Sequence, residues 1–328
     1  MNNLLNVDNL SELESVLFSE DNKPIYLPVC DHYAGNPKFF SKAMTFKTNL
    51  GDLFDITLDL EDGARVGEEI EQAIWVVEAL KQYADQFNHK LRMPGVRLNH
   101  FEHPAFSQQA EIILAQEVAP SPSYLMIPKP ACLNAAQESI QTLKRLAAKI
   151  GNKPLPPIHL IIETHGAVAE VQGIAQLDEI ESLSFGLMDF ISSHRSAISQ
   201  DAFNSPEQFN HALVRRAKIE IAAACHRFGK VPSHNVTRDI KNPKTAFNDA
   251  LRAKKELGFT RMWSIHPNQI EPIIQALQPS NHEIKKARQI LFLAKQANWA
   301  PIEFEGELHD RASYRYYFEI LKLSNVYH

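Results

Sequence analysis

Cysteine is scarce in this chain. Among 328 residues only Cys30, Cys132 and Cys225 occur, far apart and odd in number. Such a set fits neither a disulfide framework nor a paired zinc-ligand motif, and isolated cysteines are most simply buried small apolar residues. The sequence therefore predicts a protein of a reducing compartment.

Long apolar runs and a large excess of charge are also missing. No stretch approaches the roughly 20 apolar residues that a membrane-spanning helix needs, and residues 1–23 lack the basic start and apolar centre of a signal peptide. The formal net charge is -5, which gives no electrostatic footprint for nucleic acid or an anionic membrane. We therefore expect a cytoplasmic protein that binds small molecules and has neither a nucleic-acid nor a membrane partner.

What the sequence does contain is a regular alternation of short apolar runs with longer amphipathic segments, the βαβα pattern of a parallel sheet. The predicted strands cover residues 24–30, 54–60, 93–99, 124–128, 158–163, 182–186, 231–236 and 261–265. The predicted helices cover residues 67–87, 103–118, 135–151, 167–180, 206–229, 243–258 and 267–277. This amount of alternating structure, over roughly 250 residues, predicts an α/β fold of the TIM (β/α)8 barrel type, with a doubly wound open sheet as the alternative.

No internal repeat, low-complexity segment or linker divides the chain. We expect a barrel domain at residues 1–279, of which residues 1–22 are a lead-in. Two further amphipathic segments predict a C-terminal helical extension at residues 280–328, packed on the barrel, on a neighbouring subunit or over the site.

Polar and charged residues follow the predicted strands, and in a TIM barrel the reactive groups lie at the carboxyl ends of the strands. The groups in these positions are Glu61, Asp62, Arg97, Asn99, Lys129, Glu163, Thr164, Asp189 and His266.

Glu163 and Asp189 follow adjacent predicted strands, which lie about 4.8 Å apart in a parallel sheet. Two carboxylates that meet must share a proton or a cation, and a hard divalent ion suits them: Mg²⁺, with Mn²⁺ as the alternative. No cluster of histidine and cysteine nearby favours zinc. The competing interpretation is structural: Glu163 caps a helix that starts near Ala167, and Asp189 forms a salt bridge in a loop.

Arg97 and His266 also have two interpretations. Arg97 is either an ion-pair partner of Glu61 or Asp62, or a bidentate clamp for a substrate carboxylate. We expect His266 to be a helix N-cap or a packing residue ahead of Pro267 rather than a base.

Six runs from the barrel region occur in order and at suitable spacing: LDLEDGARVGEE, GVRLN, MIPKPA, LIIETHGAV, SFGLMDF and GFTRMWSIHPNQI. Together they resemble the citrate lyase beta-subunit-like branch of the HpcH/HpaI aldolase family. The resemblance implies a Mg²⁺-dependent TIM-barrel carbon–carbon lyase for citryl- or malyl-thioesters or related oxo and hydroxy acids, assembled as a homotrimer or homohexamer.

The resemblance also implies roles for individual residues. It places Glu163 and Asp189 on the family's metal ligands and Arg97 on the arginine that binds the substrate carboxylate. Glu61 and Asp62 fall on the acidic pair and are expected to act with Arg97 in catalysis. The residues expected to line the substrate, besides Arg97, are Lys129, Gly186, Leu187 and Met188.

Four positions depart from the family pattern. Asn22 stands where the family's first strand has arginine, Val29 replaces its glycine, Gly63 replaces the alanine after the acidic pair, and Phe190 replaces a leucine. Because that first strand helps to hold the thioester or coenzyme A, a CoA-independent 2-oxo-acid aldolase stays open as an alternative. A malyl-thioester thioesterase with the same metal site and a non-catalytic dicarboxylate-binding subunit with the same fold are two further alternatives. The presence of Glu163, Asp189 and Arg97 together favours catalysis.

Overall fold

The computed structural model describes residues 10–18, 25–63, 66–115, 120–151 and 154–326. These residues fall into two compact units. One is Leu27–Leu277, and the other combines the described parts of Met1–Tyr26 and Gln278–His328. In the described part of the chain, no helix has the length and apolar character needed to cross a bilayer.

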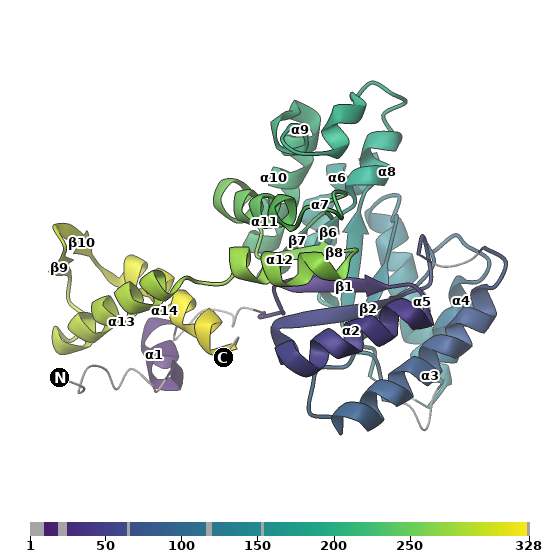
Figure 1. The fold of residues 1–328 in the computed structure, drawn as a ribbon, viewed down its shortest axis with the longest axis horizontal. Helices are drawn as coiled ribbons and strands as arrows, with labels where there is room; N and C mark the ends of the chain where they lie inside the picture. Colours follow the sequence, from purple (N-terminus) through teal and green to yellow (C-terminus); the bar gives the residue numbers. More distant parts are fainter. Residues whose placement is uncertain (1–9, 19–24, 64–65, 116–119, 152–153, 327–328) are drawn as a thin grey trace. The chain divides into compact units, whose positions relative to one another are not determined.

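The first unit is a closed parallel barrel whose strands pair in sequence order, with the last strand returning to the first (Figure 1). The strands are β1 Cys30–Ala34, β2 Phe54–Asp59, β3 Gly95–Arg97, β4 Leu125–Ile127, β5 Ile158–Ile162, β6 Ile180–Phe185, β7 Val231–His234 and β8 Arg261–Ser264. The predicted TIM barrel is therefore confirmed, and closure of the sheet excludes the open doubly wound alternative.

Helices connect the strands in the described ranges. They are α2 Pro37–Leu50, α3 Glu69–Phe87, α4 Phe106–Leu114, α5 Leu133–Lys149, α6 His165–Ala169, α7 Val171–Ala175, α8 Leu187–Ser192, α9 Glu207–Asn210, α10 Ala212–Arg227, α11 Pro243–Leu257 and α12 Ile270–Leu277, with short 3-10 turns at Gly51–Leu53, Gln200–Phe203 and Pro267–Gln269. Helix α11 shows why the boundaries fall where they do: Asn242 caps it, Pro243 fills the first turn, and Gly258 ends it at a φ of 76°. His266 likewise caps its 3-10 turn, as expected.

The prediction for the first strand was wrong. The apolar residues 25–29 precede the strand, because Pro28 cannot donate to the sheet, and β1 begins only at Cys30; residue 24 lies outside the described ranges. The helix α2 was not predicted at all, although Asn36 caps it through a 3.0 Å hydrogen bond from the Phe39 backbone nitrogen and Pro37 lies in its first turn. The predicted helix at residues 167–180 is two short helices, α6 and α7.

Charged groups fill the barrel interior near the amino ends of the strands. Arg261 lies 2.8 Å from Asp55 and 3.3 Å from Asp31, and all three side chains are about 1% exposed. Such a buried network is sensitive to loss of one partner, because the remaining charge would stay buried and unpaired. At the other end the interior is aromatic, with Tyr33 stacked on Trp263 at 5.0 Å between ring centroids.

A buried histidine makes the stability of this barrel dependent on pH. Burial lowers the pKa of His32 to about 4, and the nearby His266 adds to the effect. The unfolded chain therefore takes up a proton at higher pH than the folded chain, so stability is lost as the pH falls from about 6.5 to about 4. We expect wild type to lose about 2 kcal/mol more stability than His32→Asn between pH 7.5 and pH 5, measured by urea unfolding. If the free energy of unfolding falls by the same amount in both proteins over this pH range, the expectation is refuted.

The second unit holds α13 Asn281–Gln296, the hairpin of β9 Ile302–Phe304 and β10 Glu307–His309, and α14 Arg311–Val326. Helix α1, Leu10–Leu17, belongs to the same unit: Leu13 and Leu17 share a core with Phe318, and Arg315 Nε donates to the Leu17 carbonyl at 2.8 Å. The extension is thus helical as predicted, with an added hairpin, and it includes part of the segment that the sequence analysis assigned to the barrel as a lead-in.

Candidate active site

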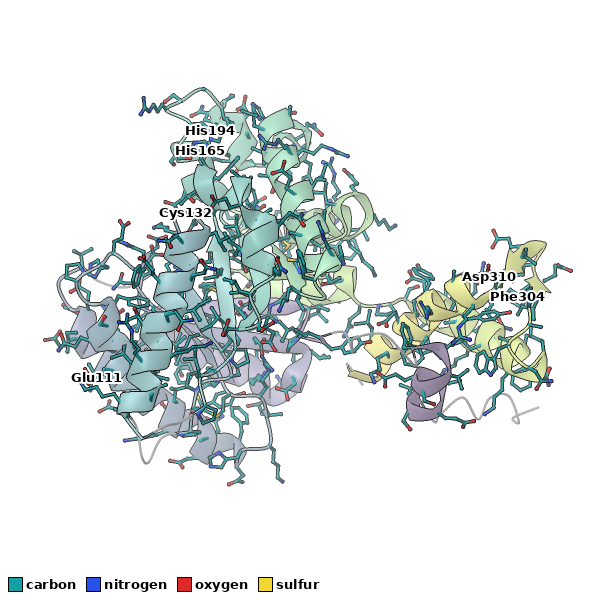
Figure 2. The ribbon with its side chains drawn as sticks, turned by 180° about the vertical axis from the view of Figure 1, so that it is seen from behind. Glu111, Cys132, His165, His194, Phe304 and Asp310 are labelled. Atoms are coloured by element: carbon teal, nitrogen blue, oxygen red, sulfur yellow. The ribbon has the colours of Figure 1, made fainter. Side chains whose placement is uncertain are left out.

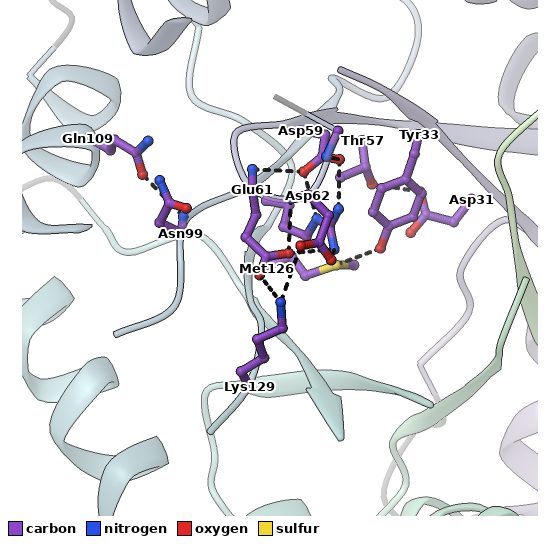
Figure 3. Close-up of polar contacts among 12 residues, drawn as sticks. Asp31, Tyr33, Thr57, Asp59, Glu61, Asp62, Asn99, Gln109, Met126 and Lys129 are labelled. Atoms are coloured by element: carbon purple, nitrogen blue, oxygen red, sulfur yellow. Dashed lines mark hydrogen bonds and ion pairs between the residues drawn. The ribbon is translucent and has the colours of Figure 1, made fainter. Parts of the chain in front are cut away.

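The predicted site residues come together at the carboxyl ends of five neighbouring strands. Glu61 and Asp62 follow β2, Arg97 ends β3, and Lys129 follows β4. Glu163 follows β5, and Asp189 lies in the first turn of α8 after β6. Figure 3 shows the acidic pair reaching Lys129 across the mouth of the barrel.

Glu163 is a buried carboxylate with only 4% exposure. Its Oε1 accepts a hydrogen bond from the Lys129 backbone nitrogen at 3.0 Å. Burial raises the pKa of Glu163 well above its usual range, and the negative charges of Asp189 and Glu61 raise it further. A group in this environment gains stability from a proton or a cation beside it.

The interpretation of Glu163 as a helix cap is wrong. Thr164 caps α6 instead, because its Oγ1 accepts from the Ala167 backbone nitrogen at 3.1 Å. Asp189 does contact a cation of the chain, with Lys129 Nζ at 3.6 Å, and 43% of its side chain is exposed. The Glu163 carboxylate thus has no capping role, and Asp189 faces the same cation as the acidic pair.

Arg97 is held on two sides by acidic groups. Its Nε and Nη2 each donate to a carboxylate oxygen of Asp59 at 2.6 Å, and its Nη1 lies 2.9 Å from Glu61 and 3.8 Å from Asp62. Its guanidinium also lies 5.1 Å from the centre of the Tyr33 ring. The ion pairs expected with Glu61 and Asp62 are therefore present, and the two-nitrogen edge that would clamp a carboxylate is taken by Asp59.

Asp59 is a residue of the candidate site that the sequence analysis missed. Besides Arg97, it accepts hydrogen bonds from the backbone nitrogens of Glu61 at 3.0 Å and Gly63 at 2.9 Å. A Cβ at Gly63 would lie 2.3 Å from Asp59 Oδ2, so the loop needs glycine there. A usable signal was the alternation of polar residues at 55, 57 and 59 within the second strand, which points them all into the barrel.

Lys129 connects the acidic groups of the site. Its Nζ lies 2.5 Å from Glu61, 3.2 Å from Asp62 and 3.6 Å from Asp189. Its backbone has a φ of 56°, a left-handed conformation that a residue with a side chain rarely adopts. Burial of Glu61 raises the pKa of that carboxyl although Arg97 and Lys129 oppose the shift.

The charge balance and the ligand atoms fit a hard divalent cation. Five carboxyl groups and two cationic side chains meet here, which leaves a formal excess of three negative charges: Asp59, Glu61, Asp62, Glu163 and Asp189 against Arg97 and Lys129. In the described ranges no three His, Cys, Asp or Glu side chains form a complete metal cage. Glu163 and Asp189 would thus supply two oxygen ligands and leave the other positions to water and substrate, as Mg²⁺ prefers.

The residues of the segment 186–188 differ in what they can offer a substrate. Gly186 is buried against Glu163, and the Leu187 side chain is 2% exposed in the core, so Leu187 would contribute only its backbone. Met188 is 39% exposed and free to contact a ligand.

Because Gly186 has no side chain, the Glu163 carboxylate can lie directly against it. A larger residue at position 186 is expected to weaken metal binding. A Cβ at Gly186 would lie 2.0 Å from Glu163 Oε2, so Gly186→Ala must displace the carboxylate. We expect Mg²⁺ affinity, measured by calorimetry, to fall about 10- to 100-fold. Gly173→Ala, which meets only the flexible end of Leu133 at 2.9 Å, is the control. Equal affinities in both variants would show that Glu163 is not a ligand.

Known proteins resemble this chain in sequence and in fold. The profile of the HpcH/HpaI aldolase/citrate lyase family matches residues 40–267. An L-malyl-CoA/beta-methylmalyl-CoA lyase of Rhodobacter capsulatus is 27% identical over 272 residues, which cover 79% of this chain and 84% of that protein.

Solved structures of proteins with the same fold support this family match. A citrate lyase of Burkholderia xenovorans LB400 is 44% identical, with a TM-score of 0.84 over 93% of this chain and 94% of that chain. The CitE protein of Mycobacterium tuberculosis, solved with magnesium, acetoacetate and coenzyme A, shares the fold at 20% identity and a TM-score of 0.68, over 91% of this chain and 98% of that chain. With two thirds of its length matched by the family profile and a close relative along nearly all of it, the chain belongs to the HpcH/HpaI aldolase/citrate lyase family.

Proposed function

We propose that this protein is a Mg²⁺-dependent carbon–carbon lyase of the citrate lyase beta-subunit or malyl-CoA lyase type. It would cleave or form a bond between an oxo acid and the acyl group of a CoA thioester. The observation that carries the proposal is the buried Glu163 carboxylate beside Asp189, in a cluster with excess negative charge at the mouth of a TIM barrel. The ligands of the Mycobacterium tuberculosis protein and the activity named for the Rhodobacter capsulatus relative support the substrate class.

Glu163 and Asp189 would hold the metal, with Mn²⁺ as an alternative ion. Bound there, Mg²⁺ supplies Lewis-acid polarisation of a carbonyl oxygen. Arg97 and Lys129 add positive charge for a substrate carboxylate. Because Asp59 occupies the Nε and Nη2 edge of Arg97, a carboxylate that binds Arg97 must approach Nη1 and displace Glu61 from it.

Glu61 is the best-placed group for proton transfer, with Asp62 beside it. In the cleavage direction the bond between the hydroxyl-bearing carbon and the thioester α-carbon breaks, the hydroxyl becomes a carbonyl and loses its proton, and the α-carbon gains one. No electrons leave the substrate, so no redox partner is needed. The raised pKa of Glu61 and its contact with Lys129 suit a carboxyl that gives and takes a proton.

A CoA-independent 2-oxo-acid aldolase is the second candidate. It is favoured by the first strand, because the run that resembles the family's first strand precedes β1, and Val29 stands where the family has glycine. Asn22, the other departure, lies outside the described residues. A thioesterase for malyl thioesters or a non-catalytic dicarboxylate-binding subunit would use the same groups.

Calorimetric titration separates these functions. Oxaloacetate, glyoxylate, acetyl-CoA and malyl-CoA are titrated into the full chain with Mg²⁺ and with chelator. A lyase is expected to bind a thioester only with Mg²⁺ and to convert malyl-CoA to glyoxylate and acetyl-CoA. Binding of free oxo acids alone would indicate the aldolase instead of the lyase. Release of malate and CoA would indicate the thioesterase, and binding without any product would indicate the non-catalytic dicarboxylate-binding subunit.

We further propose that the protein is a homotrimer or homohexamer and that the C-terminal unit, residues 280–328 in the boundaries expected from sequence, mediates assembly. Among the described residues of this unit, the large apolar side chains of Leu308 and Tyr316 are 77% and 61% exposed, which suits a protein contact. Light scattering of the full chain tests the proposal, and a monomer at micromolar concentration would contradict it.

A further inference from the structure

A cavity lies among α6, α8 and α10, and its lining includes residues close in sequence to the candidate metal ligands. Its volume is about 220 Å³. One wall is formed by the rings of His165, Phe190 and His194, and Figure 2 shows the two histidines next to each other. The ring centroids of His165 and His194 are 4.4 Å apart, and those of Phe190 and His194 are 4.6 Å apart, so the three rings form one continuous surface.

Hydrogen bonds within the chain fix which ring nitrogens are available. His194 Nδ1 lies 2.6 Å from the Phe190 carbonyl oxygen, which only accepts, so this nitrogen carries a hydrogen. His165 Nε2 lies 3.3 Å from the Ser193 carbonyl oxygen and 3.1 Å from Ser193 Oγ. Because Ser193 Oγ donates its own hydrogen to the Phe190 carbonyl at 2.8 Å, Nε2 is the donor to both Ser193 oxygens. In the described part of the chain the other nitrogen of each ring has no hydrogen-bond partner, and each can accept from a ligand hydroxyl.

A positive charge and an apolar surface complete the cavity. Arg216 lines it, and its Nε donates to Glu220 at 2.8 Å, which leaves the terminal guanidinium nitrogens for an anion. Val168, Ala217 and the 41% exposed Leu213 supply aliphatic contacts.

We propose that this cavity is a second ligand site for a small hydroxy acid with an apolar side chain. The carboxylate would pair with Arg216, the hydroxyl would donate to an imidazole nitrogen, and the hydrocarbon would pack against Phe190 and Leu213. The volume lies below the roughly 300–1,000 Å³ of sites for drug-sized ligands, which suits a small metabolite. The proposal does not depend on the lyase function.

Occupancy of this site is expected to act on the metal site. Phe190 directly follows Asp189, and His165 lies two residues after Glu163. A ligand that contacts both rings restrains both segments, so it should change Mg²⁺ affinity, and Mg²⁺ should change the affinity of the ligand by the same factor.

The probe for the test is 3-phenyllactate, titrated into the full chain in chelator, so that metal-dependent binding at the barrel mouth does not contribute. We expect saturable binding, weakened about threefold to fivefold by Arg216→Gln because the guanidinium is mostly exposed. Arg145→Gln, an exposed arginine on α5, is the matched control and should bind as wild type does. 3-Phenylpropionate, which lacks the hydroxyl, should bind more weakly than the probe.

Variants that fill the cavity test whether the probe binds there. Leu213→Trp, at an exposed position on α10, should abolish binding, and Ala169→Trp serves in its place if circular dichroism shows that the first variant is unfolded. No saturable binding at millimolar probe, or equal binding by the blocked and open proteins, would overturn the proposal. If saturating probe leaves Mg²⁺ affinity unchanged, the coupling to the metal site is refuted while the ligand site stands.

Discussion

Replacing Asp189 with alanine is expected to abolish Mg²⁺ binding and turnover together. The change leaves Glu163 as the only remaining carboxylate of the proposed pair of metal ligands. Because the pair is all that the described residues offer the ion, we expect one carboxylate to be too few to hold it. We expect calorimetry to show no Mg²⁺ binding at millimolar ion and turnover to fall by at least about 10³-fold, the scale on which loss of transition-state charge stabilisation acts.

The control for this variant is Asp85→Ala, which removes an exposed carboxylate on α3. It should leave both Mg²⁺ affinity and turnover as in wild type. Unchanged activity of Asp189→Ala would remove Asp189 from the metal site. Lost turnover with intact Mg²⁺ binding would instead assign Asp189 to substrate or proton chemistry.

The second large effect is expected from Asp59→Asn. The amide keeps the shape of Asp59 but loses the charge that holds the Nε and Nη2 edge of Arg97, in a place where the guanidinium is only 7% exposed. Breaking a buried ion pair from one side costs about 3–5 kcal/mol of stability. Because Asp59 also fixes the loop that carries Glu61, we expect kcat/KM to fall about 100-fold through misplacement of these groups.

A double-mutant cycle with Arg97→Gln separates positioning from loss of stability. If Asp59 acts through Arg97, Asp59→Asn should cost far less activity in the Arg97→Gln background than in wild type. Mg²⁺ affinity should change little, because the hydrogen bonds of Asp59 within the described residues go to Arg97 and to the loop at Glu61 and Gly63, and not to Glu163 or Asp189. Asp85→Asn, at an exposed position on α3 outside the site, is the control of matched chemistry and should leave activity as in wild type. Additive losses in the cycle would make Asp59 a purely structural residue.

The barrel could be predicted from sequence because its strands are short apolar runs that alternate with amphipathic helices. Seven of its strands lie where that pattern placed them. The first does not, because β1 reads Cys-Asp-His-Tyr-Ala and points polar side chains into the interior, whereas the apolar run before it contains two prolines. The strand β2 also points charged residues inward, but its alternate positions are the large apolar residues Phe54, Ile56 and Leu58. The alternate positions of β1 are Cys30, His32 and Ala34, which form no apolar run that patterning could find.

The candidate site was predicted with one rule, that reactive groups in a TIM barrel lie at the carboxyl ends of the strands. That rule found Glu61, Arg97, Lys129, Glu163 and Asp189, and the structure brings all five together. It did not find Asp59, which ends β2 but lay inside the longer strand predicted at residues 54–60, nor could it show that Thr164 rather than Glu163 caps α6. Both depend on side-chain direction and hydrogen bonding, which a strand-end position does not specify.

The left-handed backbone of Lys129 sets a limit on how stable this protein can become without losing its chemistry. A residue with a Cβ pays about 1–2 kcal/mol in that conformation, and glycine would not. Glycine would keep the N–H that Lys129 donates to Glu163 but would lose the ammonium that contacts Glu61. We therefore expect a search for thermostable variants to select glycine at position 129 and, with it, a protein without the proposed activity.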